Sequence, residues 1–258
     1  MPDWNPALYS RFENERTRPA RDLLAAVQLD RPGLLVDLGC GPGNSTELLA
    51  HRFPSARVLG IDSSPAMIAT ARSRLPQYAF EQGDITSWKP PTAPDLIFAN
   101  AVLQWLPDHA ALFPALLAKL KPGGVLAVQM PDNLDEPSHR AMRALASEPP
   151  WAENLAKAVA SRTSLPPLND YYNRLCLQAG SVAVWRTTYH HPMSSPGAIV
   201  DWLRSTGLKP FLDALRGDQH AEFIRRFKSR IDEAYPAQAD GQRLLAFPRI
   251  FIVATRRP

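Results

Sequence analysis

The sequence predicts an α/β fold built on a parallel β-sheet, and three observations indicate it. Short apolar segments recur in the first half of the chain and alternate with helical patterns, which is typical of βαβ units. A glycine-rich turn separates the first apolar segment from the helix that follows it. Polar residues stand at the carboxyl ends of successive segments, and in open α/β sheets these ends meet at the edge that binds ligands.

The five expected strands are short and mostly apolar, as strands buried on both faces of a sheet are. They comprise residues 34–38, 58–61, 79–82, 95–99 and 125–130. Helical patterns follow the first, second and fourth of these strands. In the second helix, Ser64 is the expected N-cap and Pro65 lies in the first turn. This alternation predicts right-handed crossovers between parallel strands.

The second half of the chain has two long helical blocks, residues 131–180 and 196–235, and two further strand patterns, residues 182–189 and 244–254. We expect these strands to complete the sheet. The helical insertions after the fifth and sixth strands are expected to form a cap over its ligand-binding edge. The expected divisions are an N-terminal segment that closes over the ligand (1–30), a sheet core (31–131, 182–191 and 244–258) and a helical cap (132–181 and 192–243).

Composition narrows the class of protein. The chain has 258 residues, of which 45% are apolar and 21% charged, so a packed globular core is expected. No segment approaches the ~20 consecutive apolar residues of a membrane span, and the N-terminus lacks the pattern of a secretory signal. Cys40 and Cys176 are the only cysteines, too few for a disulfide framework. A reduced, cytoplasmic location is therefore expected, with no membrane partner.

The net charge of +4 and the pI of about 9.2 make the chain mildly basic. The Lys and Arg residues are scattered, whereas a nucleic-acid-binding protein more often has a concentrated basic stripe. Only residues 225–230 form such a run, and we interpret them as the solvated face of a helix. A modest positive excess suits a small anionic substrate, and nothing in the sequence implies an oligomer.

The turn after the first strand is the most informative segment. Alternating glycines at 39, 41 and 43 (G-x-G-x-G) let the backbone turn sharply and approach a ligand closely. Asn44 stands where a dinucleotide-binding loop has its third glycine, which argues against a dinucleotide dehydrogenase. Asp37 precedes the loop, where it either orients an ammonium group or binds the loop amides. Cys40 has no paired base in the sequence, so we interpret it as a small loop residue and not as a nucleophile.

Acidic and amide side chains follow the next three strands. Asp62 ends the second strand about twenty residues after the glycine loop, where an acid accepts hydrogen bonds from both ribose hydroxyls of a nucleotide-like ligand. Asp84 follows the third strand and Asn100 ends the fourth. Each feature alone is a weak signal, but four successive strand ends together predict a nucleoside-binding site.

These residues resemble the motifs of the class I S-adenosylmethionine-dependent methyltransferases, which have a Rossmann-like sheet. The resemblance implies S-adenosyl-L-methionine as cofactor, S-adenosyl-L-homocysteine as product and no metal. It places Asp84 opposite the adenine amine, Ile85 and Met67 against the adenine ring, and Asn100 near the methionine end. The implied cofactor-binding set is Asp37, Gly39, Cys40, Gly41, Gly43, Asn44, Asp62, Ser63, Met67, Asp84, Ile85 and Asn100.

Longer segments resemble one narrower family, the trans-aconitate methyltransferases. They are residues 3–6 (DWNP) with Tyr9, 60–69 (GIDSSPAMIA), 96–101 (LIFANA) joined to 104–109 (QWLPDH), 125–133 (VLAVQMPDN), 185–189 (WRTTY) and 244–253 (LLAFPRIFIV). The resemblance runs nearly end to end and is weakest at residues 145–168. It implies a bacterial cytoplasmic enzyme that forms the monomethyl ester of trans-aconitate or a close polycarboxylate.

A carboxylate acceptor is already ionised at neutral pH, so its methylation needs no general base. The absence of an obvious His/Asp or Cys/His constellation agrees with such an acceptor. The remaining carboxylates would need Arg, hydroxyl or indole donors. By resemblance and position, the candidates for substrate binding are Trp4, Tyr9, Arg18, Gln104, Trp105, Tyr171, Tyr172, Arg186 and Tyr189.

Each candidate for substrate binding has a structural alternative. Trp4 and Tyr9 would equally fix the N-terminus to the body of the protein, and Trp105 would fit in the core. Arg186 lies in a strand pattern and would equally pair with a surface acid. The remaining tyrosines would equally pack within the cap.

Two further functions stay open at this point. One is a methyltransferase that acts on an oxygen, nitrogen or carbon centre of a non-carboxylate acceptor, with His109 or His190 as the base. The other is a protein that binds the nucleoside cofactor without catalysis. The adjacent His190 and His191 point to opposite faces of a strand and lack further ligands at metal spacing, so we interpret them as supporting or surface residues.

Overall fold

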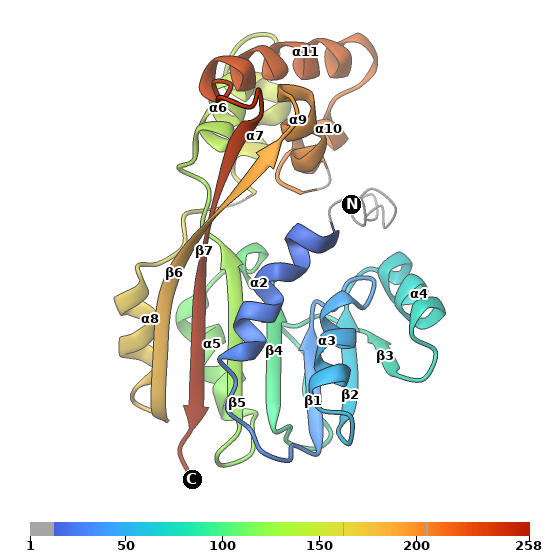
Figure 1. Cartoon of the computed structure of the whole chain (residues 1–258), viewed down its shortest axis with the longest axis vertical. Helices are drawn as coiled ribbons and strands as arrows, with labels where there is room; N and C mark the ends of the chain where they lie inside the picture. Colours follow the sequence, from blue (N-terminus) through green and yellow to red (C-terminus); the bar gives the residue numbers. More distant parts are fainter. Residues whose placement is uncertain (1–12, 162, 205) are drawn as a thin grey trace.

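A seven-stranded mixed sheet in the order β3-β2-β1-β4-β5-β7-β6 forms the body of the molecule (Figure 1). The computed structural model describes residues 13–161, 163–204 and 206–258. Strands β1 to β5 are parallel, and β7 runs antiparallel between β5 and β6. The predicted α/β fold is confirmed. The strands are β1 Leu34–Leu38, β2 Arg57–Asp62, β3 Ala79–Gln82, β4 Leu96–Asn100, β5 Val125–Pro131, β6 Ala179–Met193 and β7 Arg243–Arg256.

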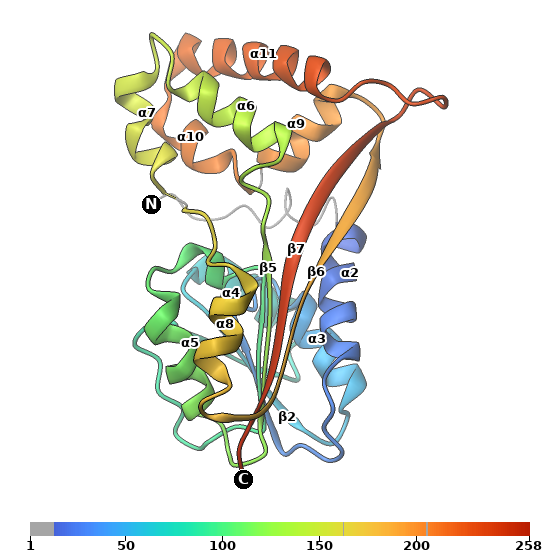
Figure 2. The same cartoon turned by 90° about the vertical axis from the view of Figure 1, so that its left-hand side faces the viewer.

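Helices cover both faces of the sheet (Figure 2). On one face, α2 (Glu13–Ala25) and α3 (Asn44–Arg52) pack against the sheet in one apolar cluster. On the other face, α5 (His109–Ala118) and α8 (Leu168–Leu175) pack in a second cluster. The remaining elements of the body are α4 (Pro65–Arg74) and the 3₁₀ turn η1 (Leu103–Trp105).

Local capping sets where two of these helices begin. The Ser64 hydroxyl accepts a hydrogen bond from the backbone N–H of Met67 at 3.2 Å, with Pro65 in the first turn, as the sequence predicts. Asp108 caps α5 in the same way by accepting from the N–H of Ala111. Both helices therefore start at a side chain that accepts from an amide of the first turn.

Among the described residues, five helices form a cap, which lies above the sheet in Figures 1 and 2. They are α6 (Pro137–Ala146), α7 (Ala152–Val159), α9 (Pro196–Arg204), α10 (Lys209–Ala214) and α11 (Gly217–Ala234). They enclose their own apolar core, in which Trp151, Trp202, Phe223 and Phe227 are fully buried. The cap thus consists of two insertions, one between β5 and β6 and one between β6 and β7.

Helix α8 lies outside this cap, although the expected cap segment 132–181 includes it. Its buried residues Tyr171 and Leu175 belong to the core of the sheet, where α8 contacts α5 and β6. The reason is tertiary, because the apolar face of α8 fits the sheet beside β6. The first cap insertion is therefore shorter than the expected segment.

Strands β6 and β7 are longer than the sequence patterns indicated, and they form a two-stranded ribbon that rises from the sheet to the cap (Figure 1). Within β7, Phe251 belongs to the core between the sheet and α2, whereas Phe247 belongs to the core of the cap. The ribbon is thus shared by both cores. Among the described residues, no helix has the length and apolarity that crossing a membrane requires.

Phe227→Ala is expected to lower the free energy of unfolding by about 3–5 kcal/mol, because it leaves a cavity in the core of the cap. Leu177→Ala is the control: that side chain is 73% exposed. The control is expected to change stability by less than about 0.5 kcal/mol. Urea unfolding measures both, and a loss below about 1 kcal/mol for Phe227→Ala would contradict a tightly packed cap.

Candidate functional site

The glycine loop after β1 is fixed by its backbone. The N–H groups of Gly39 and Cys40 both donate to the carbonyl of Ile61 at the end of β2, at 2.7 and 3.0 Å. Gly39 and Gly41 have positive φ angles of 68° and 54°. A Cβ atom at Gly39 would lie 2.3 Å from Cγ2 of Val102, whereas one at Gly41 would meet nothing within 4 Å. The loop is therefore packed on one side and open on the other.

Asp62 holds this loop from the end of β2. Its Oδ2 accepts a hydrogen bond from the N–H of Gly41 at 2.9 Å, and its Oδ1 accepts from the N–H of Ser64 at 2.9 Å. The carboxylate is thereby oriented at the carboxyl edge of the sheet, next to the glycine loop. The structure brings Asp62 and the loop together, as the sequence pattern led us to expect.

Asp37 is fully buried beneath the loop. Its Oδ2 accepts hydrogen bonds from the hydroxyls of Ser45 and Thr46, each at 2.7 Å, in the first turn of α3. Within the described part of the chain, its Oδ1 has no hydrogen-bond partner. Burial raises the pKa of Asp37 to about 7, the two hydroxyls oppose this rise, and the nearby Asp62 adds to it. These hydroxyl contacts take the place of the loop-amide contacts that the sequence suggested.

An open pocket lies on the glycine loop. Two acceptor atoms at its wall, Oγ1 of Thr17 in α2 and Oδ1 of Asn100 in β4, are buried without a hydrogen-bond partner among the described residues. Burial also raises the pKa of the Cys40 thiol, which therefore stays protonated. The lining residues are Thr17, Ala20, Gly39, Cys40, Gly41, Pro42, Asn44, Ser45 and Asn100.

Five of these lining residues were candidates from the sequence, and four were not. Ser45 and Pro42 adjoin the glycines, so proximity in the sequence was an available signal for both. Thr17 and Ala20 come from α2, whose place on the sheet depends on tertiary packing. No sequence motif marks them.

The remaining cofactor candidates do not line this pocket: Ser63, Asp84 and Ile85 follow β2 and β3, Met67 lies in α4, and Gly43 lies in the glycine loop. Asp84 is exposed, and its Oδ1 accepts hydrogen bonds from the N–H and the hydroxyl of Thr86 at 2.8 Å, which lower its pKa. Met67 and Ile85 are buried, and Ser63 is exposed. Gly43 has a φ angle of 96° and precedes α3.

Tyr171 and His109 are bonded to each other in the core of the sheet. The Tyr171 hydroxyl lies 2.7 Å from Nδ1 of His109, and Nε2 of His109 lies 2.9 Å from the carbonyl of Leu103. A carbonyl only accepts, so Nε2 carries the proton and Nδ1 accepts from the tyrosine. Both nitrogens of His109 are engaged, and Tyr171 packs in the core of the sheet and not within the cap, where its structural alternative put it. The neighbouring Tyr172 is 46% exposed.

Arg186 and Tyr189 lie on β6 and contact different parts of the molecule. Arg186 is exposed and forms an ion pair with Asp132, the arrangement of its structural alternative. Tyr189 is buried, and its hydroxyl donates to Asp22 of α2. The guanidinium of Arg18 lies 5.1 Å from the centre of the Tyr189 ring. The structure therefore brings Arg18 and Tyr189 together and places Arg186 apart from them.

The other candidates for substrate binding are in η1 or in the N-terminal segment. Gln104 is buried, and its Nε2 donates to the carbonyl of Ala101 at 2.7 Å. Trp105 is half-buried at the end of η1. Trp4 and Tyr9 lie outside the described residues.

Known proteins match this chain at two levels, a domain family over part of the sheet and relatives over the whole length. The family described as "Methyltransferase domain" matches residues 35–124. Trans-aconitate 2-methyltransferase of Variovorax paradoxus (strain S110) is 59% identical over 100% of both chains, and that of Methylobacterium radiotolerans is 60% identical over 99% of both. The chain belongs to the trans-aconitate 2-methyltransferase family.

Two solved structures share the fold of this chain at low sequence identity. The YcgJ protein of Bacillus subtilis aligns with a TM-score of 0.59 at 14% identity, over 93% of this chain and 99% of that one. Phosphoethanolamine N-methyltransferase 2 of Haemonchus contortus, solved with S-adenosyl-L-methionine, aligns with a TM-score of 0.56 at 18% identity, over 93% of this chain and 53% of that one. Both confirm the Rossmann-like sheet of this methyltransferase.

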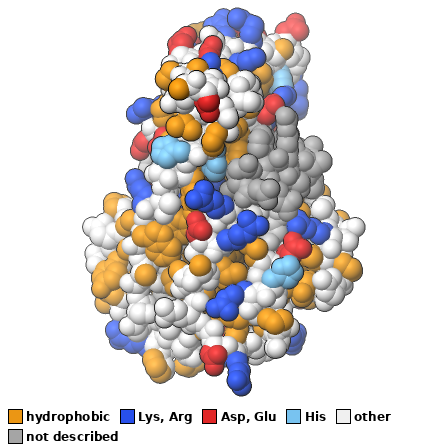
Figure 3. Space-filling model, viewed as in Figure 1, with side chains coloured by type: hydrophobic (Ala, Val, Ile, Leu, Met, Phe, Trp, Pro, Cys, Tyr) orange, Lys and Arg blue, Asp and Glu red, His pale blue; other side chains and the backbone are white. Residues whose placement is uncertain are grey.

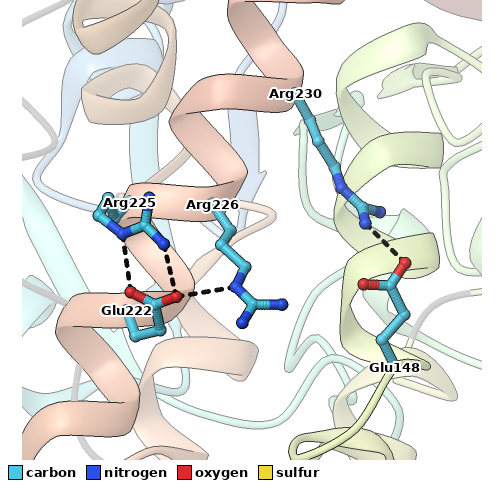
Figure 4. Close-up of polar contacts among 5 residues, drawn as sticks. All are labelled: Glu148, Glu222, Arg225, Arg226 and Arg230. Atoms are coloured by element: carbon cyan, nitrogen blue, oxygen red, sulfur yellow. Dashed lines mark hydrogen bonds and ion pairs between the residues drawn. The ribbon is translucent and has the colours of Figure 1, made fainter.

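The basic segment of this methyltransferase lies on α11 and is paired with acids (Figure 4). Glu222 accepts hydrogen bonds from Arg225 and Arg226, and Arg230 pairs with Glu148 at 2.6 Å. Figure 3 shows Lys and Arg side chains spread over one face, with acidic and apolar side chains between them. These pairs fit the interpretation of this segment as a solvated helix face.

Two buried residues that sequence analysis missed extend the site across the sheet. Gln129 of β5 pairs in register with Asn100 of β4, and Arg249 of β7 is only 3% exposed. Nη1 of Arg249 donates to Oε1 of Gln129 at 3.1 Å. We call Asp37, Asn100, Gln129 and Arg249 the polar row of this methyltransferase. A buried polar residue in a strand pattern was the available signal, because such a position is normally apolar.

Asp37→Asn is expected to remove a pH dependence of folding. The unfolded chain releases the Asp37 proton near pH 3.8 and the native chain near pH 7, so ionisation favours unfolding. The free energy of unfolding of the ligand-free protein therefore falls by about 4 kcal/mol as pH rises from 4 to 7, and it is level above pH 7. The Asn variant lacks this fall.

Urea unfolding at each half pH unit measures the difference between the two proteins. Other titrating groups act on both proteins alike, so the difference isolates Asp37. Parallel stability curves between pH 4 and pH 7 would contradict a raised pKa at this position.

Proposed function

We propose that this chain methylates a carboxylate of trans-aconitate, or of a close polycarboxylate, with S-adenosyl-L-methionine as the methyl donor. The observation that carries this proposal is 59–60% identity to trans-aconitate 2-methyltransferases over the whole chain, cap included. The identity extends well beyond residues 35–124, where the general methyltransferase domain matches. The cap, which we expect to bind the substrate, lies within the length that these relatives match.

The pocket on the glycine loop fits the methionine end of this cofactor. S-adenosyl-L-methionine carries an ammonium and a sulfonium group, and it supplies a methyl group to the oxygen of the acceptor, leaving S-adenosyl-L-homocysteine. The pocket offers acceptor atoms from Thr17 and Asn100, with the buried Asp37 beneath the loop. Buried acceptors without partners complement a cationic group, because each lacks its hydrogen bond until a donor binds.

Asp62 is positioned to bind the ribose. A carboxylate has about four acceptor sites, so it can orient the loop through Gly41 and Ser64 and still receive ribose hydroxyls. Asp84 and Ile85 follow β3, and Met67 lies in the first turn of α4, where the family resemblance places the adenine. These roles are part of the proposal.

A carboxylate acceptor agrees with the chemistry available in the site. The acid is ionised at neutral pH, so the chain needs only to bind it, align it with the methyl group and exclude water. Both nitrogens of His109 are engaged in the core, which removes one base that a non-carboxylate acceptor would need. The cytoplasmic location and the absence of a metal stay predictions.

The direct test is methyl transfer from labelled S-adenosyl-L-methionine to trans-aconitate, cis-aconitate, isocitrate and citrate. A strong preference for trans-aconitate supports the proposal. Cofactor binding without transfer to any of these acids would keep the fold and the cofactor but overturn the acceptor.

Asp62→Ala is expected to weaken the binding of S-adenosyl-L-homocysteine by roughly 10- to 150-fold, because it removes charged hydrogen bonds to two hydroxyls. Isothermal titration calorimetry measures this affinity. Asp218→Ala is the matched control, since Asp218 is an exposed carboxylate on α11. The control variant should bind S-adenosyl-L-homocysteine as tightly as the wild type. Equal affinity in the Asp62 variant would remove Asp62 from the cofactor site.

A further inference from the structure

The polar row connects the cofactor pocket to the base of the cap. Asn100 lines the pocket, Gln129 pairs with it on the next strand, and Gln129 in turn pairs with Phe251 of β7. Arg249 is two residues from Phe251, so its side chain lies on the same face of the sheet. This is the face on which α2 packs (Figures 1 and 2). One face therefore carries polar groups from β4 through β5 to β7.

Arg249 lies where the core of the sheet meets the core of the cap. On its strand, Phe251 packs in the first core and Phe247 in the second. The guanidinium carbon is 4.8 Å from the centre of the Phe247 ring, and Nη1 donates to Gln129. A guanidinium taken out of water is costly to bury, and its planar set of donors matches a carboxylate. Such a group is more typical of a ligand site than of a structural core.

Two more buried nitrogen atoms come from β5 and β6, the strands on either side of β7. Nε2 of Gln129 and Nε2 of His191 have no hydrogen-bond partner among the residues that the structure describes. Gln129 is fully buried, and His191 is 5% exposed. Such a group destabilises the folded protein if it stays without a hydrogen bond. Both nitrogen atoms can therefore donate a hydrogen bond to a ligand that has acceptor atoms.

The surroundings of His191 show that the local field is positive. Burial lowers the pKa of His191 to about 4, and the charges of Arg249 and Arg18 lower it further. The imidazole is therefore neutral at physiological pH and can present an N–H. A positive field, an amide donor and an imidazole together favour an anion.

We propose that Arg249, positioned by Gln129, binds a carboxylate of the acid substrate other than the one that is methylated. This inference rests on the proposed function and makes Arg249 a determinant of substrate specificity. Two strand spacings separate β4 from β7, or about 10 Å, which the arginine side chain and a six-carbon acid can span together. The reacting carboxylate then lies at the cofactor pocket while a second carboxylate reaches Arg249.

The test combines a protein variant with trimmed substrates. Arg249→Met removes the guanidinium at similar length, and Arg256→Met is the matched control. Arg256 lies at the opposite end of β7, where it donates to the carbonyls of Ala118 and Leu120. The substrates are trans-aconitate and three diacids that each lack one of its carboxylates: itaconate, mesaconate and cis-glutaconate. Affinity for S-adenosyl-L-homocysteine is measured on every variant to confirm an intact cofactor site.

We expect Arg249→Met to lower kcat/KM for trans-aconitate by roughly 30- to 1,000-fold through a higher KM, with cofactor affinity within about twofold of the wild type. For the diacid that lacks the carboxylate bound by Arg249, kcat/KM should be almost the same in this variant as in the wild type. Arg256→Met should resemble the wild type on all four acids. An unchanged KM for trans-aconitate, or an equal loss on every acid, would overturn the inference.

A second variant, Arg249→Lys, tests the inference if Arg249→Met does not fold and therefore does not bind the cofactor. It keeps the buried charge but loses the planar fork, so KM for trans-aconitate should rise about tenfold. No rise would overturn the inference. A wild-type protein that methylates none of the four acids would instead contradict the proposed function, so the two failures are distinguishable.

Discussion

Strands β6 and β7 pair without interruption from Ser181 and Thr255 in the sheet to Met193 and Arg243 in the cap. A slip of one residue in an antiparallel pair would turn every side chain to the opposite face. The apolar residues of both cores hold this register, because Phe251 packs under α2 and Phe247 packs within the cap. The position of Arg249 between them follows from this pairing.

The cofactor pocket depends on polar groups that are buried beneath and beside the glycine loop. The Asp37 carboxyl is enclosed beneath the glycine loop, and the hydroxyls of Ser45 and Thr46 connect it to the start of α3. Helix α2 closes the same face and contributes Thr17 to the pocket wall. Polar atoms are therefore kept from water but not fully satisfied, which is the condition under which a ligand gains most from hydrogen bonds.

The sequence predicted the parts of the site that depend on local geometry. A glycine with positive φ, such as Gly41, and an acid at a strand end, such as Asp62, are marked by residue type and spacing. Both lie where the pattern placed them, in a sheet with the expected strands. The N-cap Ser64 is local in the same sense.

The parts that depend on pairing were not predictable in this way. Arg186 and Arg249 both lie in strand patterns, and only the register shows that one meets Asp132 in solvent while the other is buried beside Gln129. The rotation of α8 about its own axis was not predictable either, and it places Tyr171 in the core of the sheet. Thr17 belongs to the site only because α2 packs on this face.

In the proposed complex, cofactor and acid bind side by side along the polar row, on the face covered by α2. A crystal structure with S-adenosyl-L-homocysteine and trans-aconitate tests it most directly. We expect one carboxylate of the acid within hydrogen-bond distance of the Arg249 guanidinium and another directed at the sulfur of the product. An acid bound on the face covered by α5 and α8, or with every carboxylate away from Arg249, would contradict the claim.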